Sequence, residues 1–313
     1  MSKLNICIVG GTGFVGHVIT DKLVDQGHRL KILTRHRELH RGFLVLPTVD
    51  LVEGDIHDQS FLNQEFAGMD VVINLAGILN QFRGKPTFEM VHAILPAYIA
   101  DACKNQGVPR LLHMSALKAS NGGPSQYLRT KGTGEDRVHQ MAGQKVHVTS
   151  FRPSVIFGAS DSFTNRFAHL LHIAPGVLPL ACPGARFQPV WVDDVAEAFV
   201  RAIGNYQTYG KRYELCGPRV YTLKEIVDYV ARVTRTRCYV VPLNDTLSRL
   251  QALLGEFLPG KPISLDNYGS MREDSCCKEG FPEVFGIKPT EMEAVVPHYL
   301  AHDRREHPRS RRR

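Results

Sequence analysis

The chain has 313 residues, enough for one large domain or two small ones, and a chain of this length buries roughly three quarters of its unfolded surface. Its hydrophobic content of 43% and charged content of 22% are typical of a globular protein and exclude a disordered, collagenous or coiled-coil chain. The basic tail, residues 304–313, holds +5 of the formal net charge of +7, so no nucleic-acid partner is expected.

The cysteines and the apolar runs bear on the compartment. The seven cysteines form neither a CxxC pair nor a Cys/His zinc spacing, and their odd number without a framework favours a reducing compartment. No apolar run is long enough for a membrane-spanning helix, and the first one is too short for a secretory signal. We therefore expect a cytoplasmic protein without a bound metal, and a peripheral position at the inner face of the membrane stays open.

The first half of the chain alternates short apolar runs with segments of helical period. This alternation predicts βαβ units and a parallel sheet that is buried on both faces. Strands are expected at 5–9, 30–33, 48–53, 71–75, 110–114 and 146–151, and helices at 14–26, 88–105 and 126–141.

The second half is less regular. A strand is expected at 213–216, followed by a helix at 222–234 that Thr222 and Glu225 cap reciprocally. An apolar stripe at helical spacing follows, and we expect it to pack on its own domain, with a partner-facing or membrane-surface role as the alternative. The stripe consists of Leu247, Leu250, Leu253, Leu254, Phe257 and Leu258.

A glycine-rich turn directly after the first strand carries the strongest functional signal. Gly10 permits a tight turn, Gly13 lets the backbone approach a pyrophosphate, and Gly16 permits close packing of helix on strand. The N–H groups of the helix that begins here would meet the anion. The turn therefore predicts a dinucleotide site, which also includes Thr12, Phe14 and Val15.

The end of the second strand indicates which dinucleotide is preferred. An NAD site places an acid there to hold the ribose 2′-hydroxyl, but this strand ends in Thr34-Arg35 and no acid follows until Glu38. A guanidinium suits a 2′-phosphate instead, so Arg35 predicts NADP(H) in preference to NAD(H).

Several segments resemble the extended short-chain dehydrogenase/reductase superfamily, the NAD-dependent epimerase/dehydratase-like proteins. They are the turn GGTGFVG, the Gly54-Asp55 pair, Asn74-Leu75-Ala76-Gly77 and the Tyr127–Lys131 segment. Residues 113–117, 152–158 and 187–194 are similar to an atypical branch of it. That branch contains the nucleotide-binding accessory subunit of respiratory complex I and its bacterial relatives.

The resemblance implies a fold and a set of cofactor contacts. The fold would be a doubly wound parallel Rossmann sheet over residues 1–160, a smaller mixed α/β lobe over 161–303, and the tail. Asp55 and Ile56 would flank the adenine, and Leu75, Ala76 and Gly77 would line the cofactor cleft. Pro153, Ser154 and Val155 would lie near the nicotinamide.

The resemblance also implies a catalytic group. Tyr127 and Lys131 are four residues apart, so a helix presents both on one face. In the superfamily the tyrosine is the general acid/base, and the lysine lowers its pKa and binds the nicotinamide ribose. Ser115 is a candidate third member, but the position of the superfamily serine falls on Leu117, which leaves the donor set incomplete.

Three functions stay open at this point. The first is an NADP(H)-binding, redox-linked accessory or assembly protein, with a respiratory complex or membrane surface as partner. The second is an NAD(P)-dependent oxidoreductase or epimerase that acts on a nucleotide sugar or a quinone-pathway intermediate. The third is a regulatory protein that senses the cofactor. Leu117 favours the first and third, and the intact Tyr127–Lys131 pair supports the second.

Overall fold

The computed structural model describes residues 3–82, 84–174, 176–258 and 261–301. The chain divides into two compact units. The first runs to Pro153 and also contains Asp193–Leu215 and Pro282–Ile287; the second contains Ser154–Val192, Cys216–Phe281 and the residues from Lys288. The expected domains 1–160 and 161–303 stay predictions, and the tail lies outside the described residues.

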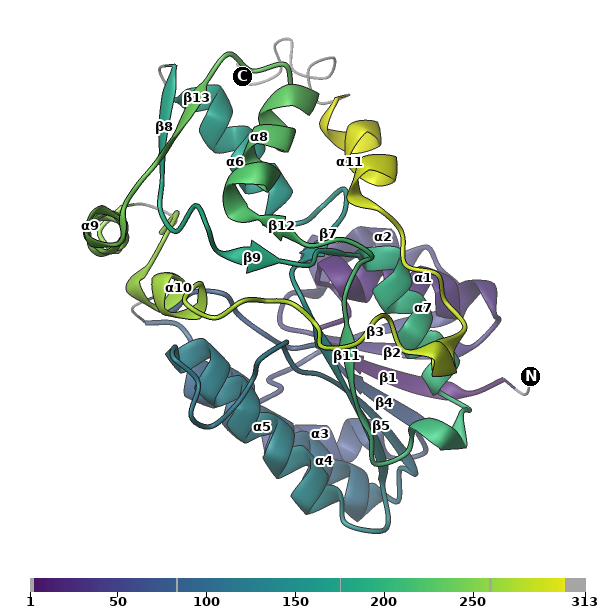
Figure 1. Ribbon diagram of the computed structural model, residues 1–313. Helices are drawn as coiled ribbons and strands as arrows, with labels where there is room; N and C mark the ends of the chain where they lie inside the picture. Colours follow the sequence, from purple (N-terminus) through teal and green to yellow (C-terminus); the bar gives the residue numbers. More distant parts are fainter. Residues whose placement is uncertain (1–2, 83, 175, 259–260, 302–313) are drawn as a thin grey trace. The chain divides into compact units, whose positions relative to one another are not determined.

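The first unit is built on a seven-stranded parallel sheet with the order β11-β6-β5-β4-β1-β2-β3 (Figure 1). The strands are β1 Asn5–Val9, β2 Arg29–Thr34, β3 Val49–Glu53, β4 Val71–Asn74, β5 Arg110–Met114, β6 His147–Pro153 and β11 Arg212–Leu215. The strand order reverses between β1 and β4, and ligands of such sheets bind outside the carboxyl ends of the strands at that point. The predicted doubly wound Rossmann sheet is confirmed.

Helices cover both faces of this sheet (Figure 1). The helices α3 (Gln59–Phe66), α4 (Leu95–Gln106) and α5 (Gln126–Ala142) pack on one face, where their apolar side chains meet those of β1, β4 and β5 in a common core. On the other face α1 (Phe14–Asp25) is tied to α7 (Val192–Ala202), because Lys22 forms ion pairs with Asp193 and Glu197. The short elements are η1 Arg37–His40, α2 Arg41–Leu44, η3 Tyr206–Thr208 and η4 Glu283–Phe285.

The single helix expected at 88–105 is divided. Its first part, η2 (Glu89–Ile94), is a π-helix that continues directly into α4. Gly134 of α5 approaches the π-turn, since a Cβ there would overlap the carbonyl oxygen of His92. Close helix contact therefore accompanies the departure from α-helical geometry.

The second unit is smaller and mixed, as predicted. Its elements are β7 Ile156–Phe157, α6 Thr164–Ile173, β8 Val177–Leu180, β9 Arg186–Phe187, β10 Val190–Trp191, β12 Tyr221–Thr222, α8 Leu223–Val233, β13 Tyr239–Pro242, α9 Asp245–Gly255, α10 Leu265–Ser270 and α11 Met292–Leu300. The strands form three pairs, of which β12–β9 is antiparallel and β10–β7 and β13–β8 are parallel. The capping box of α8, formed by Thr222 and Glu225, is confirmed.

One prediction for this unit is wrong. The apolar stripe of α9 does not pack on its own domain: the buried residues of the helix are Ser248, Ala252 and Gly255, and the leucines are exposed. The helical period was right, but the small side chains face inward.

A disulfide in the second unit was not anticipated. Cys216 and Cys277 are bonded, with their Cα atoms 6.1 Å apart and 61 residues between them in the sequence. The Gln188 side chain bridges the same two segments, because its amide donates to the Gly217 carbonyl and accepts from the Cys277 N–H.

Among the described residues, no helix is long and apolar enough to cross a membrane.

Candidate functional site

The glycine turn lies between the end of β1 and the start of α1. Gly10 has a φ of +82°, and a Cβ there would lie 2.9 Å from the Ala76 backbone nitrogen. Gly16 is buried against the turn, where a Cβ would overlap the Gly11 carbonyl. These two positions therefore require glycine for the reasons that the sequence suggested.

The fit of this turn to a pyrophosphate rests on its exposed side. A Cβ on Gly13 would meet nothing closer than the Gly10 carbonyl oxygen at 3.3 Å, so the backbone is open there. Gly13 is the N-cap of α1 and provides no side chain to cap the helix. The N–H groups of Phe14, Val15 and Gly16 thus form a helix N-terminus suited to an anion. Thr12 is half-buried beside them.

The segment after β4 lies next to this turn. The Leu75 N–H donates to the Val9 carbonyl, and the Asn74 side chain accepts from the Ala76 N–H. A Cβ on Gly77 would lie 3.2 Å from the Lys131 Nζ atom. The structure therefore brings the predicted cleft residues Leu75, Ala76 and Gly77 together with the glycine turn and the lysine.

Tyr127 and Lys131 lie one turn apart on α5, as predicted. Lys131 is buried, and its ammonium donates to the Met114 carbonyl at 3.1 Å. Burial lowers the pKa of Lys131 to about 8, although the carboxylate of Glu135 acts in the opposite direction. The half-buried Tyr127 ring meets the Phe88 and His92 rings edge-on, with centroid separations of 5.9 and 5.3 Å.

His92 connects the segment after β4 to the helix that carries Lys131. Its Nε2 atom accepts from the Ile78 N–H at 3.0 Å, and its Nδ1 atom lies 3.2 Å from the Thr130 hydroxyl. Burial and the nearby Lys131 lower the pKa of His92 to about 2, so the ring is neutral and can accept from Ile78. The sequence suggested a packing or hydrogen-bonding histidine here but not this link.

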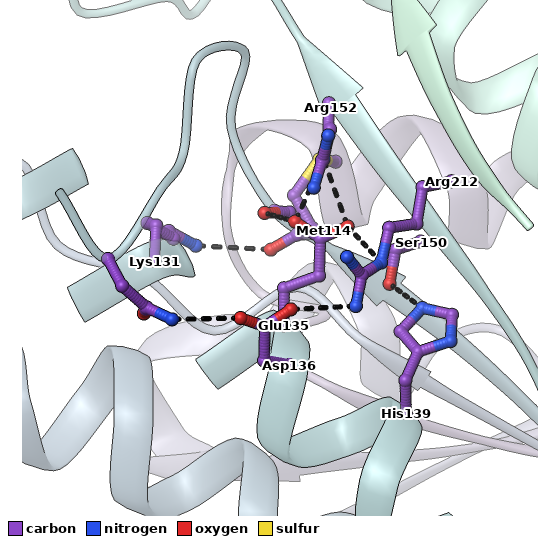
Figure 2. Close-up of polar contacts among 10 residues, drawn as sticks. Met114, Lys131, Glu135, Asp136, His139, Ser150, Arg152 and Arg212 are labelled. Carbon is purple, nitrogen blue, oxygen red and sulfur yellow. Dashed lines mark hydrogen bonds and ion pairs between the residues drawn. The ribbon is translucent and has the colours of Figure 1, made fainter. Parts of the chain in front are cut away.

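Ser115 is committed to a buried carboxylate rather than to the tyrosine. Its hydroxyl donates to Glu135 at 2.7 Å, and Glu135 is completely buried. Figure 2 shows the side chains of Arg152 and Arg212 directed at the same carboxylate, at 2.9 and 3.3 Å. Two guanidinium groups and one hydroxyl thus satisfy a buried charge that would otherwise be strongly destabilising.

Leu117 occupies the position where the resemblance expects a serine. The residue is buried, and its N–H donates to the Pro153 carbonyl at 2.9 Å. Its side chain offers no hydrogen-bond donor, and the nearest strand-end hydroxyl, Ser115, already donates to Glu135. Neither Leu117 nor Ser115 therefore offers a free hydroxyl donor in this described segment.

Arg35 is exposed at the end of β2, but a carboxylate also reaches this loop. Glu53 ends the neighbouring strand β3 in register with Thr34, and its side chain accepts from the Arg37 N–H at 2.8 Å. Sequence reasoning missed this acid because it counted only along the chain. Parallel register between β2 and β3 was the signal that could have found it.

The other predicted contacts are placed as follows. Asp55 is exposed and its carboxylate accepts from the His57 N–H, while Ile56 packs against the core of the first unit. Pro153 ends β6 in the first unit. Ser154 and Val155 belong to the second unit, where the Ser154 hydroxyl donates to the Ser275 carbonyl at 2.8 Å and the Val155 carbonyl accepts from Val190.

Comparison with known proteins gives a family match and distant relatives. The profile of the NAD dependent epimerase/dehydratase family matches residues 6–216. The mitochondrial NADH dehydrogenase [ubiquinone] 1 alpha subcomplex subunit 9 of Mus musculus is 32% identical over 242 residues, which cover 75% of this chain and 63% of the mouse protein. The chain thus spans less than two thirds of that relative.

Two further comparisons cover most of the chain. The NADH-ubiquinone oxidoreductase 40 kDa subunit of Neurospora crassa is 28% identical over 306 residues, which cover 94% of this chain and 78% of that protein. The NADPH-dependent quinone oxidoreductase QOR2 of Escherichia coli, solved with NADPH, superposes with a TM-score of 0.72 at 18% identity, covering 95% and 99% of the two chains. The superposition establishes similarity of fold.

Proposed function

Because the chain belongs to the NAD dependent epimerase/dehydratase family, we propose that it binds NADP(H) and acts as a redox-linked accessory or assembly protein of a respiratory complex. The relatives in Mus musculus and Neurospora crassa are subunits of such a complex by name. The observation that carries the proposal is the commitment of Ser115 to Glu135 together with a leucine at position 117.

The residues of the site fit a dinucleotide. The helix N-terminus at Gly13 would receive the pyrophosphate, Arg35 would face the 2′-phosphate, and Lys131 would hold the nicotinamide ribose. When bound, the cofactor supplies a hydride or accepts one. The chain itself contributes binding and a buried ammonium.

The hydrogen-bond donors near Tyr127 decide between a protein that only binds the cofactor and an enzyme that turns over a substrate. Stabilising an oxyanion requires preorganised donors aimed at the developing charge, and loss of one such donor costs about a hundredfold or more in rate. Here Leu117 has no hydroxyl and the Ser115 hydroxyl already donates to Glu135, so neither residue supplies that donor. Retained cofactor with slow or absent turnover is therefore the expected behaviour.

The first prediction tests this accessory function. Tyr127→Phe should leave both cofactor retention and assembly with the partner complex unchanged, because no proton transfer depends on the hydroxyl. The measurement is the nucleotide content of the purified variant together with NADPH oxidation over a panel of sugar-nucleotide and quinone substrates. Tyr206→Phe, at a residue 75% exposed, makes the same chemical change away from the site and serves as the control.

A working reductase is the second candidate, and the Tyr127–Lys131 geometry favours it. The two residues are one turn apart, and a pKa of Lys131 near 8 suits a group that assists proton transfer at neutral pH. In that case Tyr127→Phe should lower turnover by roughly two to four orders of magnitude. A substrate-dependent NADPH oxidation lost in this variant and kept in Ser115→Ala would overturn the accessory proposal.

The second prediction concerns cofactor preference. NADPH should bind more tightly than NADH, and Arg35→Asp should reverse the order, because a carboxylate repels a 2′-phosphate and accepts from a 2′-hydroxyl. Glu53 accepts from the Arg37 N–H through one oxygen only, so tighter binding of NADH by the unaltered protein would assign the 2′ position to Glu53 instead of Arg35. Calorimetry gives both dissociation constants. Arg29→Asp, exposed at the other end of β2, is the matched control, and equal constants for the two cofactors in the unaltered protein would refute the preference.

A further inference from the structure

Helix α9 is built with its small residues inward and its large apolar residues outward. The inward residues Ser248, Ala252 and Gly255 repeat at helical spacing, and Ser248 Oγ accepts from the Cys182 N–H. A Cβ on Gly255 would overlap the Ile263 carbonyl, so the helix lies close against its support. The outward leucines are 45–59% exposed, and they are Leu247, Leu250, Leu253 and Leu254.

The outward surface continues beyond the helix. Phe257 is 82% exposed and Leu258 is 53% exposed immediately after α9. On the preceding strand, β13, Tyr239 and Val241 are exposed, and Tyr239 pairs in register with the exposed Val177 of β8. We call this set the apolar face: Val177, Tyr239, Val241, Leu247, Leu250, Leu253, Leu254, Phe257 and Leu258.

This face is too apolar to be an ordinary part of a protein surface. The four leucines of α9 span about 120° of the helix, the width of a stripe that normally faces a core. Scattered exposed leucines need no explanation, but four that share one face of a single helix mark an interaction site. Each of the nine side chains is large or β-branched, and none of them is charged.

Basic residues occur in the same stretch of the chain as most of the apolar face. Arg232, Arg235 and Arg237 precede β13 and are exposed, and Arg249 is exposed on α9 itself. No ion pair involves these four arginines within the described part of the chain. The acids of the same segment are engaged, since Glu256 pairs with Lys261 and Asp245 accepts from the Tyr268 hydroxyl.

We propose that the apolar face docks on an anionic lipid bilayer, with α9 lying in the interfacial plane. Amphipathic helices bind in this way when large apolar side chains enter the acyl boundary and cations meet the headgroups. Arg232 lies over the Tyr229 ring, so Arg235, Arg237 and Arg249 supply the charge complementarity that selects an anionic bilayer over an apolar protein partner. The proposal is independent of the proposed function, because it requires neither cofactor nor substrate.

The test measures binding of the full-length protein to vesicles by flotation. Vesicles of phosphatidylcholine with about one third phosphatidylglycerol should bind the protein, and vesicles of phosphatidylcholine alone should bind it far less. The double variant Leu250→Ser/Phe257→Ser should lower the partition coefficient about a hundredfold. Arg237→Gln/Arg249→Gln should lower it about fivefold per arginine, with a smaller effect at high salt.

Matched controls separate the face from other causes of binding. Leu39→Ser/Val45→Ser removes two similarly exposed apolar side chains from the first unit and should change nothing. Because the altered face is exposed, the melting temperature of each variant should stay within a few degrees of the wild type, and this measurement confirms that the variants fold.

Three results would overturn the proposal. One is failure of the unaltered protein to bind anionic vesicles at low salt. Another is binding that persists in Leu250→Ser/Phe257→Ser but disappears when residues 302–313 are deleted, which would assign it to the basic tail. The third is a dimer in analytical ultracentrifugation that this variant dissociates while vesicle binding is unchanged, which would make a second copy the occupant.

Discussion

Lys131 is buried and carries a positive charge. Its contribution to stability and its expected contribution to cofactor binding therefore change with pH in opposite directions. Its folded-state pKa is about 8, below the ordinary value of 10.5, because desolvation disfavours the ammonium more than Glu135 favours it. Between these two values the unfolded chain binds more protons than the folded protein. The contribution of Lys131 to the free energy of unfolding therefore rises as the pH is raised from 8 to 10.5.

The third prediction follows for cofactor binding. The ammonium that would hold the nicotinamide ribose is lost above pH 8, so the dissociation constant for NADPH should rise about fivefold between pH 8 and pH 9. Over the same interval the contribution of Lys131 to the free energy of unfolding of the cofactor-free protein should rise. Calorimetry and urea unfolding measure the two quantities.

The control for this prediction is Lys131→Met, which should flatten both pH profiles and weaken NADPH binding at neutral pH. The methionine keeps the apolar stem of the lysine and removes the charge. A dissociation constant that stays constant across pH 8–9 in the unaltered protein would contradict a role for the ammonium in binding.

At the residue scale, the sequence predicted those residues whose role depends only on the neighbouring stretch of chain. Gly10 needs a positive φ and Gly16 needs a close backbone contact, and both demands follow from a turn between a strand and a helix. The partner of Ser115 could not be predicted in the same way. Its hydroxyl meets Glu135, which lies 20 residues away on α5, and only the packing of α5 on β5 brings them together.

At the element scale, periodicity predicted the helices but not their orientation. The spacing of the α9 leucines was read correctly as helical, yet spacing alone does not say whether a stripe faces the core or the solvent. The distinguishing signal was the opposite stripe of Ser248, Ala252 and Gly255, which permits closer approach than the leucines do. The spacing of the leucines therefore predicts the helix, and the size of the side chains on the opposite stripe indicates which side faces inward.

The π-turn of η2 shows a second limit at this scale. No residue of Glu89–Ile94 breaks a helix, and the sequence accordingly predicted an uninterrupted segment. Pro96, in the first turn of α4, has no N–H to donate to the His92 carbonyl, and Gly134 of α5 lies so close to that carbonyl that no Cβ fits. A glycine inside a helix costs about 1 kcal/mol relative to alanine, so Gly132 and Gly134 each indicate a close partner, and the structure shows Ser120 against the first and His92 against the second.

At the scale of the whole molecule, the parallel sheet could be predicted and the disulfide could not. Strand order follows from βαβ units joined in a consistent hand, which is a property of the chain pattern. Seven cysteines allow many pairings, and the bonded pair joins residues from two segments that only the fold brings together. The predicted cytoplasmic location rested on the number of cysteines and stays a prediction. In a reducing compartment Cys216 and Cys277 would be thiols, and in an oxidising one they would be bonded.

The last prediction uses two adjacent cysteines as variant and control. The Cys216–Cys277 bond closes a loop whose ends are 61 residues apart, and it stabilises the fold by restricting the unfolded chain. Loss of the bond should therefore lower the free energy of unfolding by about 4 kcal/mol. Cys277→Ser should show this loss in urea without reductant, and dithiothreitol should then cause no further loss. Cys276→Ser changes the neighbouring residue, which is outside the disulfide, and should keep both the stability and its sensitivity to reductant.

Cys216→Ser/Cys277→Ser should be no less stable than either single variant, because one bond is lost in all three. Titration of seven thiols in the oxidised, denatured protein would instead mean that the bond does not form, and the buried Cys216 and half-buried Cys277 would then be thiols held near each other by Gln188.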